Sequence, residues 1–345
     1  MSANDTAVVL SEKFLAHRCQ DSHPENPARL EPILKLFDKP WLKALPVITP
    51  VLAQDRLLES VHSAGMIEAL KMARGSSGWF DSDTYFGPQS IETALFAAGS
   101  GMELATKIWK GEFRRGFSLV RPPGHHATPN RVMGFCLLNN VALAAAAILN
   151  EKPTARLAIV DFDLHHGNGT QDAFYQNPNV LFISSHRFPF YPGTGSLEEN
   201  GTGAGKGTCV NFPLNRPFGD NVFVALYGDV VYGMLKKFRP DMILVSAGFD
   251  GHFADPMQGF QLSSDVYGVL AEWLIAAAEL TTGKILFCLE GGYEPEALAE
   301  SVEVVMDRLV NLPRAAFTPA LPRLEGDLST VESLKDYYVP FFPGI

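Results

Sequence analysis

Five continuous apolar runs, each followed by glycines and polar residues, constrain the fold of this chain more than any other feature of its sequence. Continuous runs, rather than alternating ones, are typical of strands that are buried on both faces of a parallel sheet. In such sheets the ligand site lies beyond the carboxyl ends of the strands. We therefore expect the polar residues after the five runs to meet in one crevice. The runs cover residues 117–120, 157–160, 180–183, 242–245 and 284–289.

Stretches in which apolar residues recur at helical spacing separate the runs. Alternation of strand and helix predicts parallel pairing with right-handed crossovers. Because no repeat, charge run or low-complexity linker marks a boundary, we predict a single α/β domain over residues 1–345. Residues 313–345 are expected to form an irregular C-terminal tail packed on its surface. The predicted helices cover residues 27–37, 90–110, 138–150, 219–238, 263–280 and 294–310.

Composition and charge exclude several classes of protein. Of the 345 residues 46% are hydrophobic, ample for a large core, yet no stretch reaches the roughly 18 apolar residues that span a bilayer. The first residues lack the pattern of a signal peptide. The net charge of −10 argues against nucleic acid as the main partner and favours a cationic substrate. No Cys-x-x-Cys pair occurs among Cys19, Cys136, Cys209 and Cys288, which fits a reduced, cytoplasmic setting with buried or inert thiols.

The second run ends in the segment DFDLHHGNG, residues 161–169, which carries the strongest signal for chemistry. Alternate side chains of an extended chain face the same way, so Asp161, Asp163 and His165 can converge at the end of the strand. Carboxylates with an imidazole and no cysteine form an open, catalytic type of metal site that needs one more protein ligand. Asp250, a glycine-flanked residue after the fourth run, can supply that ligand.

We therefore predict that Asp163, His165 and Asp250 bind one divalent cation. Their alternative role is to make hydrogen bonds within loops, which a lone Asp-x-His pair would favour and a second strand-end carboxylate does not. Two carboxylates neutralise the charge of the cation, and the set suits zinc, with ferrous iron as the alternative. We place Asp161 outside the ligand set, because a third carboxylate would weaken the metal as a Lewis acid.

The tandem histidines His125 and His126 follow the first run on a Pro-Pro-Gly segment. They could be metal ligands, core residues or acid/base groups. Adjacent side chains of an extended backbone point apart, so we do not expect both to bind the same ion. Histidine has the pKa nearest neutrality, which suits both the removal of a proton from water and its delivery to a leaving amine. We predict that the pair transfers protons.

Tyr293 follows Gly291 and Gly292 after the fifth run. Two glycines permit close approach of the backbone to a ligand, so the phenol could hydrogen-bond a developing oxyanion. It could equally be a packed aromatic residue, and the spacing alone does not decide between the two. His166 and His186 are predicted to be structural.

Together these motifs resemble the zinc-dependent histone deacetylase superfamily, which includes acetylpolyamine amidohydrolases and bacterial deacetylase-like amidohydrolases. The similarity extends from residues 23–30 to residues 290–293, most of the chain, and is greatest to the class II and bacterial branch. Each segment alone is a weak signal, but their combination in this order is specific. The other matching segments are 121–126, 134–136, 161–169, 191–195 and 250–257.

The resemblance implies an arginase/deacetylase fold, whose core is an eight-stranded parallel sheet flanked by helices. It implies a zinc site formed by Asp163, His165 and Asp250. It also implies that His125 and His126 form an acid/base pair and that the phenol of Tyr293 polarises the substrate carbonyl. It also implies a structural potassium ion held by residues of the same loop and the next strand. The residues concerned are Asp161, Asp163, His165, Ser184 and Ser185.

The resemblance further implies a narrow channel for an acylated lysine. Phe135 and Tyr191 would form its walls, and Gly134 would offer its carbonyl oxygen to the substrate amide. Met257 stands where polyamine-selective eukaryotic relatives have a glutamate, which weakens the polyamine alternative. Asp161 would lie behind His125. Asn168 would lie behind the second histidine, where class I relatives have Asp and class II relatives do not, so the charge of that histidine is not fixed by the resemblance.

We predict a zinc-dependent amidohydrolase that removes acetyl or related short acyl groups from the lysines of peptides and proteins or from similar primary amines. The first alternative is an acetylpolyamine deacetylase, and the second is a catalytically silent acyl-lysine binding module. The intact ligands, histidine pair and Tyr293 argue against the silent module. His252 stands where arginases have a further carboxylate, which argues for one metal ion and against the two-manganese arginase chemistry. The acyl length and the oligomeric state, a homo-oligomer included, are left open.

Overall fold

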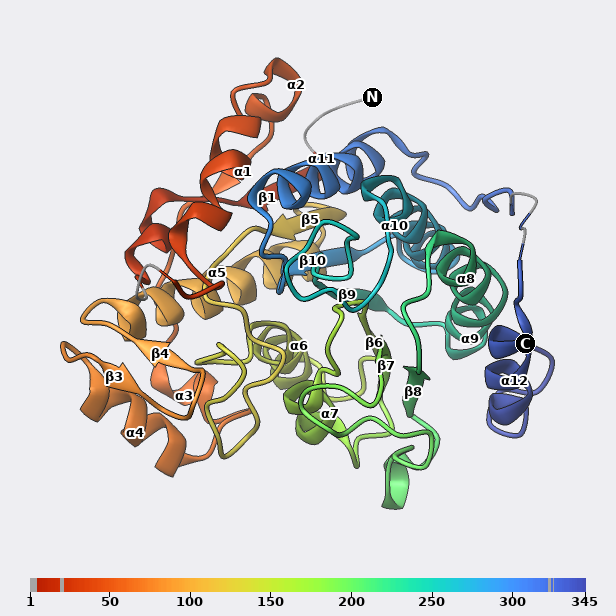
Figure 1. Ribbon diagram of the computed structural model, residues 1–345, viewed down its shortest axis with the longest axis horizontal. Helices are drawn as coiled ribbons and strands as arrows, with labels where there is room; N and C mark the ends of the chain where they lie inside the picture. Colours follow the sequence, from red (N-terminus) through yellow and green to blue (C-terminus); the bar gives the residue numbers. More distant parts are fainter. Residues whose placement is uncertain (1–4, 19–21, 322–323, 325) are drawn as a thin grey trace.

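An eight-stranded, all-parallel sheet forms the centre of the chain in the computed structural model, which describes residues 5–18, 22–321, 324 and 326–345 (Figure 1). The strand order is β2-β1-β5-β10-β9-β6-β7-β8, and every neighbouring pair is parallel. The predicted α/β class with an eight-stranded parallel sheet is thereby confirmed. The strands are β1 Thr6–Val9, β2 Val47–Ile48, β5 Arg115–Ser118, β6 Leu157–Asp161, β7 Val180–Arg187, β8 Cys209–Leu214, β9 Met242–Ala247 and β10 Ile285–Leu289, with a separate antiparallel pair of β3 Gly78–Trp79 and β4 Tyr85–Phe86.

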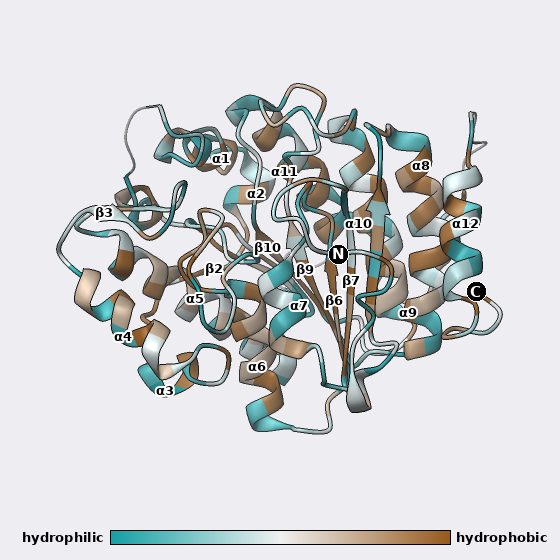
Figure 2. Cartoon of the chain, turned by 60° about the horizontal axis from the view of Figure 1, so that its bottom comes forward, coloured by the Kyte–Doolittle hydropathy of each residue, from teal (hydrophilic) through white to brown (hydrophobic). Residues whose placement is uncertain are grey.

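The strands at the centre of the sheet, β6, β9 and β10, are buried along their whole lengths. Successive side chains of a strand alternate between its faces, so a strand covered on both faces has apolar residues at nearly every position. Figure 2 shows these strands in brown between helices of mixed colour. This burial explains why the apolar runs are continuous, and the five runs correspond to β5, β6, β7, β9 and β10.

Helices cover both faces of the sheet, with α5 packed against α6 on one face and α10 against α11 on the other (Figure 1). The chain crosses the sheet in one direction from β5 to β6 and returns in the other from β9 to β10. Right-handed crossovers then place the connecting helices on opposite faces. The helices are α1 Glu31–Leu36, α2 Pro40–Lys43, α3 Asp55–Leu58, α4 Ala64–Ala73, α5 Ser90–Lys110, α6 Asn140–Glu151, α7 Asn168–Phe174, α8 Asp220–Ala225, α9 Tyr232–Phe238, α10 Ser264–Glu279, α11 Pro295–Asn311 and α12 Ser329–Tyr338.

Two of the predicted helices are interrupted. Residues 27–37 form a 3₁₀ turn, Pro27–Arg29, and then α1, because Pro32 lacks the N–H that a continuous helix would use. Residues 219–238 comprise α8, a π-helical segment, Leu226–Val231, and α9. The π-helical segment directs the hydroxyl of Tyr227 to within 3.0 Å of Ser185 Oγ in β7.

The prediction of an irregular tail over residues 313–345 is wrong in part, because α12 lies within it. Val331, Leu334 and Tyr338 recur at helical spacing and are buried against the domain. The Tyr338 hydroxyl accepts a hydrogen bond from the Asn211 amide and donates one to the Asn211 carbonyl, each at 2.8 Å. The tail therefore contacts the outermost strand, β8, through a helix.

None of the described helices combines the length and the apolar character needed to cross a membrane. Cys136, Cys209 and Cys288 are buried thiols without disulfide bonds, as the sequence predicts. Cys19 lies outside the described residues, as do the first four residues, on which the signal-peptide prediction depends.

Candidate active site

Three side chains that could hold a metal ion meet beyond the carboxyl ends of β6 and β9. Asp163, His165 and Asp250 are buried, and one ligand atom of each lies within 4.8 Å of the others. His165 Nδ1 is 3.2 Å from Asp163 Oδ1 and 2.9 Å from Asp250 Oδ2. Despite this proximity, Asp250 Oδ2 has no hydrogen-bond partner of acceptable geometry among the described residues. A buried carboxylate oxygen in that position is suited to a cation.

Backbone amides and glycines fix the two carboxylates. Gly291 N donates to Asp163 Oδ2 at 2.9 Å, and Leu164 N donates to Asp250 Oδ1 at 3.0 Å. A Cβ atom on Gly291 would lie 2.5 Å from Asp250 Oδ2 and 2.6 Å from Asp163 Oδ2. Only glycine therefore leaves room for both carboxylates at this point.

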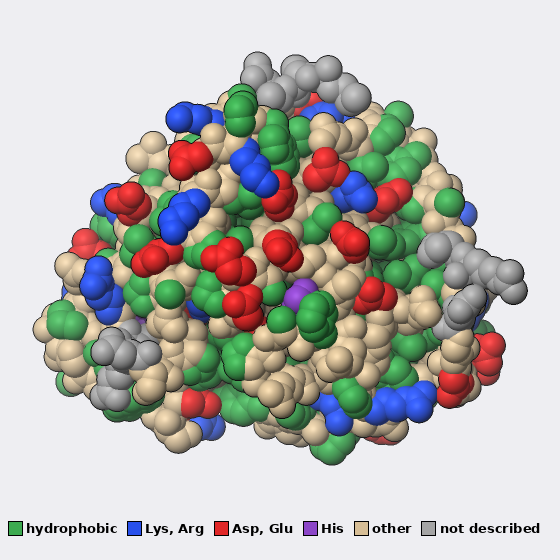
Figure 3. Space-filling view, turned by 45° about the horizontal axis from the view of Figure 1, so that its top comes forward, with side chains coloured by type: hydrophobic (Ala, Val, Ile, Leu, Met, Phe, Trp, Pro, Cys, Tyr) green, Lys and Arg blue, Asp and Glu red, His purple; other side chains and the backbone are tan. Residues whose placement is uncertain are grey.

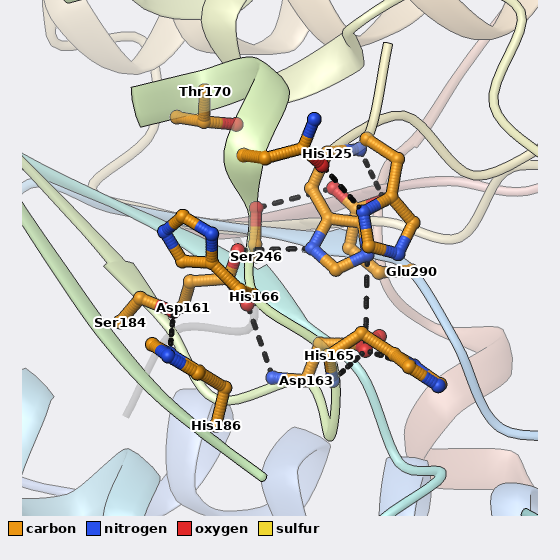
Figure 4. Close-up of polar contacts among 12 residues, drawn as sticks. His125, Asp161, Asp163, His165, His166, Thr170, Ser184, His186, Ser246 and Glu290 are labelled. Carbon is orange, nitrogen blue, oxygen red and sulfur yellow. Dashed lines mark hydrogen bonds and ion pairs between the residues drawn. The ribbon is translucent and has the colours of Figure 1, made fainter. Parts of the chain in front are cut away.

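The tandem histidines lie beside this group, each with one ring nitrogen engaged, and the position of His125 next to Asp161 and Asp163 can be followed in Figure 4. His125 Nδ1 is 3.0 Å from Asp161 Oδ2, and His126 Nδ1 is 2.8 Å from Asn168 Oδ1. The ring centroids are 4.0 Å apart, so the expectation that the two side chains point apart is wrong. They occupy a turn rather than extended backbone, and both rings reach the same site.

The two histidines differ in electrostatic environment. Burial lowers the pKa of His126, and the neighbouring His125 and His165 lower it further, well below its ordinary value. Burial also opposes protonation of His125, but the carboxylates of Asp163 and Asp161 outweigh it and raise the pKa of His125 to about 10. A cation bound to Asp163 would reduce that second effect, because it would neutralise part of the negative charge.

Asp161 lies behind His125 and not in the group that could hold a metal. Its other carboxylate oxygen accepts a hydrogen bond from Asp163 N at 3.1 Å. Ser185 Oγ lies 3.4 Å from the Asp161 carbonyl oxygen, and Ser184 Oγ lies 2.9 Å from His186 Nδ1. Both serine hydroxyls therefore have protein partners.

A cavity of about 240 Å³ leads to the histidines. Its lining is mostly apolar and aromatic, with Asp83 as a charged residue. The rings of Phe135 and Tyr293 are perpendicular, with centroids 5.8 Å apart. Gly134, at a φ of +59°, packs so closely on the His126 ring that a Cβ atom would collide with it. The lining residues are Asp83, His126, Gly134, Phe135, His165, Phe190, Tyr191, Met257 and Tyr293.

Tyr293 is held by one contact to its backbone amide and one to its ring. Its amide donates to Asp255 Oδ2 at 2.6 Å, and the Arg29 guanidinium lies over its ring, 4.6 Å from the centroid. Arg29 also donates to the carbonyl oxygens of Gly292 and, at 2.6 Å, of Glu290. Burial raises the pKa of the Tyr293 phenol well above its ordinary value, so the group remains a neutral hydrogen-bond donor.

The remaining histidines near the site have local partners, which fits their predicted structural role. His166 contacts Thr194 and Gln171 through its two ring nitrogens, at 2.8 and 3.1 Å. His186 Nε2 lies 2.9 Å from the Gly195 carbonyl oxygen. His252 Nε2 lies 3.1 Å from Ser264 Oγ, so it makes loop contacts.

Comparison with known proteins gives the family. A model of the histone deacetylase domain matches residues 23–309 of the chain. The chain belongs to the histone deacetylase family. The family membership predicted from the sequence motifs is therefore confirmed.

Several members of the histone deacetylase family align with most of this chain. A probable deacetylase of Archaeoglobus fulgidus is 36% identical over 295 residues, which cover 84% of this chain and 82% of the relative. Histone deacetylase 15 of Arabidopsis thaliana is 35% identical over 362 residues, which cover all of this chain but 64% of the relative. A crystal structure of the HDA15 HD domain superimposes with a TM-score of 0.90 at 35% identity, covering 99% of this chain and 96% of that one. The arginase/deacetylase fold is thereby confirmed.

The sequence analysis did not identify three acidic residues that support the site in this histone deacetylase family member, namely Glu25, Asp255 and Glu290. Glu25 is fully buried and accepts hydrogen bonds from both Arg29 and Arg121. Asp255 accepts hydrogen bonds from the Tyr293 amide, and Glu290 accepts them from the amides of Gly124 and His125. Their positions beside motif glycines and within residues 23–30 were the available signal, but their partners are far away in sequence.

Proposed function

We propose that this chain is a zinc-dependent amidohydrolase that removes acetyl or related short acyl groups from acylated lysine in peptides or proteins, or from similar primary amines. One observation carries the proposal: the buried group of Asp163, His165 and Asp250 lies beside the His125–His126 pair, next to an apolar cavity. Membership of the histone deacetylase family and relatives named as deacetylases support it.

Asp163, His165 and Asp250 would hold the ion. Two carboxylates and one imidazole match the ligands that zinc takes in catalytic sites, and the buried Asp250 Oδ2, which makes no hydrogen bond of acceptable geometry with the described residues, supports the fit. When bound, zinc would polarise the amide carbonyl and favour water as a nucleophile at neutral pH.

The tautomer of His126 follows from its partner. The side-chain oxygen of Asn168 can only accept, so His126 Nδ1 carries the proton and Nε2 can accept one. Its lowered pKa keeps the ring neutral, as a general base requires. Protons taken from water can then return to the leaving amine through the pair, and the Tyr293 hydroxyl can donate to the developing oxyanion.

The wall of the cavity formed by Phe135, Tyr191 and Met257 favours acylated lysine over acylated polyamine as substrate, although Asp83 also lines the cavity. Phe135, Tyr191 and Met257 present apolar or aromatic surface to an alkyl chain. Met257 offers no charge to a second ammonium group. On the face shown in Figure 3, acidic side chains are interspersed with basic ones.

A structural potassium ion close to Asp161 is also proposed, on the family resemblance alone. Because Ser184 Oγ and Ser185 Oγ contact His186 and Tyr227, backbone carbonyl groups would have to supply much of its coordination. Activity and thermal stability measured in potassium against sodium buffers test this proposal.

Turnover of a fluorogenic acetyl-lysine peptide by the zinc-loaded chain tests the proposed function. Competition between that peptide and an acetylated polyamine, each as the inhibitor of the other's hydrolysis, separates the two substrate classes. Binding of the peptide without turnover by fully zinc-loaded protein would instead support the silent binding module.

A further inference from the structure

One buried carboxylate beside the site has no part in the chemistry proposed above. Glu290 follows β10 and is fully buried. Its carboxylate lies beside Ser246 and His125 (Figure 4). A buried carboxylate is costly unless hydrogen-bond donors compensate for the lost water, so the donors around it indicate what it does.

Three donors surround the Glu290 carboxylate. Gly124 N and His125 N donate to Oε2, at 2.6 and 3.1 Å, and Ser246 Oγ donates to Oε1 at 3.1 Å. The two amides belong to the turn that carries the histidine pair. Buried amides outside helices and strands need such a partner, and here the side chain of a distant residue provides it.

The same turn is restrained on its other side by the start of α6. A Cβ atom on Gly124 would lie 2.8 Å from the Leu138 carbonyl oxygen. Asn140 Nδ2 donates to the Pro122 carbonyl oxygen at 3.0 Å. The turn therefore lies between the start of α6 and Glu290, and it contacts both.

The residues that follow Glu290 touch the other parts of the site. Gly291 N donates to Asp163 Oδ2, and Tyr293 lines the cavity. We propose that Glu290 is a positioning residue that, through its hydrogen bonds to Gly124 N and His125 N, fixes the histidine pair relative to the metal ligands and Tyr293. This inference rests on the proposed acid/base function of the pair.

Substitutions of Glu290 can separate the effect of its hydrogen bonds from the effect of its negative charge. Gln has the length of Glu, its oxygen can accept from both amides, and its NH₂ group can donate to Ser246 Oγ. Asp keeps the carboxylate but shortens its reach by one methylene. Burial raises the pKa of Glu290 to about 7, although His125 opposes the shift, so the side chain can serve as an acceptor in either protonation state.

We would compare wild type with Glu290→Gln, Glu290→Asp and Glu290→Ala, all zinc-loaded, with active sites titrated by a hydroxamate. Glu290→Gln should keep kcat per site within about tenfold of wild type. Glu290→Asp and Glu290→Ala should lose about 10²-fold in kcat with little change in KM, since a displacement of about 1 Å costs that much. Ser246→Ala, which removes the third donor without touching the turn, should stay near wild type.

Hydrogen exchange of the segment around Gly124 and His125 gives a readout that does not depend on activity. Exchange should accelerate in Glu290→Ala and remain slow in Glu290→Gln. Equal kcat per titrated site in Glu290→Asp and wild type, or equal loss in Glu290→Gln and Glu290→Ala, would overturn the inference. If wild type has no turnover, the proposed function fails, and unchanged exchange in Glu290→Ala then contradicts the positioning role separately.

Discussion

The inner end of the cavity and its mouth are built by different means. At the inner end, Asp163 and Asp250 are at most 1% exposed, and backbone amides hold both carboxylates. At the mouth, Phe190 is 37% exposed and Tyr191 is half-buried, and both meet their neighbours mainly through ring contacts. In the proposed function, the backbone of the strand ends would therefore fix the carboxylates of the site, whereas substrate choice would depend on the more exposed side chains at the mouth.

The largest effect is expected from the metal ligands. Asp250→Ala should lose both bound zinc and turnover, because two protein ligands rarely retain a catalytic ion. Metal analysis beside activity checks this, with Asp265→Ala, an exposed acid on α10, as the control for loss of one negative charge. Wild type should hold close to one zinc per chain, and two tightly bound ions would contradict the single-metal site.

The next largest effect is expected at the histidine pair. His126→Ala should retain zinc and lose about 10²–10⁴-fold in kcat, the usual contribution of a general base. Zinc content and kcat measured on the same sample check this. Loss of zinc in this variant would mean that His126 is a metal ligand. Proton transfer and metal binding would then not be assigned to separate residues.

Tyr293→Phe removes one hydroxyl and keeps the ring under Arg29. We expect kcat to fall by about 10²–10³-fold, because a donor to the oxyanion is lost. Hydroxamate affinity and zinc content should change much less. An unchanged kcat at full zinc occupancy would show that Tyr293 has only a packing role in the wall of the cavity.

The smallest effect is expected at the mouth. Met257→Glu places a charge on the cavity wall and should shift the ratio of kcat/KM from acetyl-lysine peptide toward acetylated polyamine, by under about tenfold for a partly exposed ion pair. Zinc content and hydroxamate binding should match wild type. A fall in kcat on both substrates alike would show that the mouth and the inner end are not independent.

The strand ends could be predicted from the sequence, because full burial of β6, β9 and β10 requires apolar residues at nearly every position. β8 has no such continuous apolar run, since Asn211 and Pro213 interrupt it, and β2 has only two residues.

Some residues of the site could also be predicted from the sequence, and others could not. Asp163, His165 and Asp250 could be identified from their residue types and their positions near glycines at strand ends. The contact of Glu290 with Gly124 could not, because it spans 166 residues and depends on the order of strands in the sheet. The turn at His125 could not be predicted from the sequence either, because contacts with residues distant in the sequence determine its conformation.

The hydroxyl of Tyr338 has a consequence for how molecules of this protein meet one another. Parallel sheets end in strands whose outward amides and carbonyls can pair with a strand of another chain. At β8 the Asn211 amide and carbonyl are both engaged by this one phenol, so a side chain of α12 occupies the place of a ninth strand. On the opposite side of the sheet, β2 is too short to offer a template. At Asn211 the edge of β8 is thus closed to pairing with a strand of another chain, and this protection depends on a helix outside the main alternation of strands and helices.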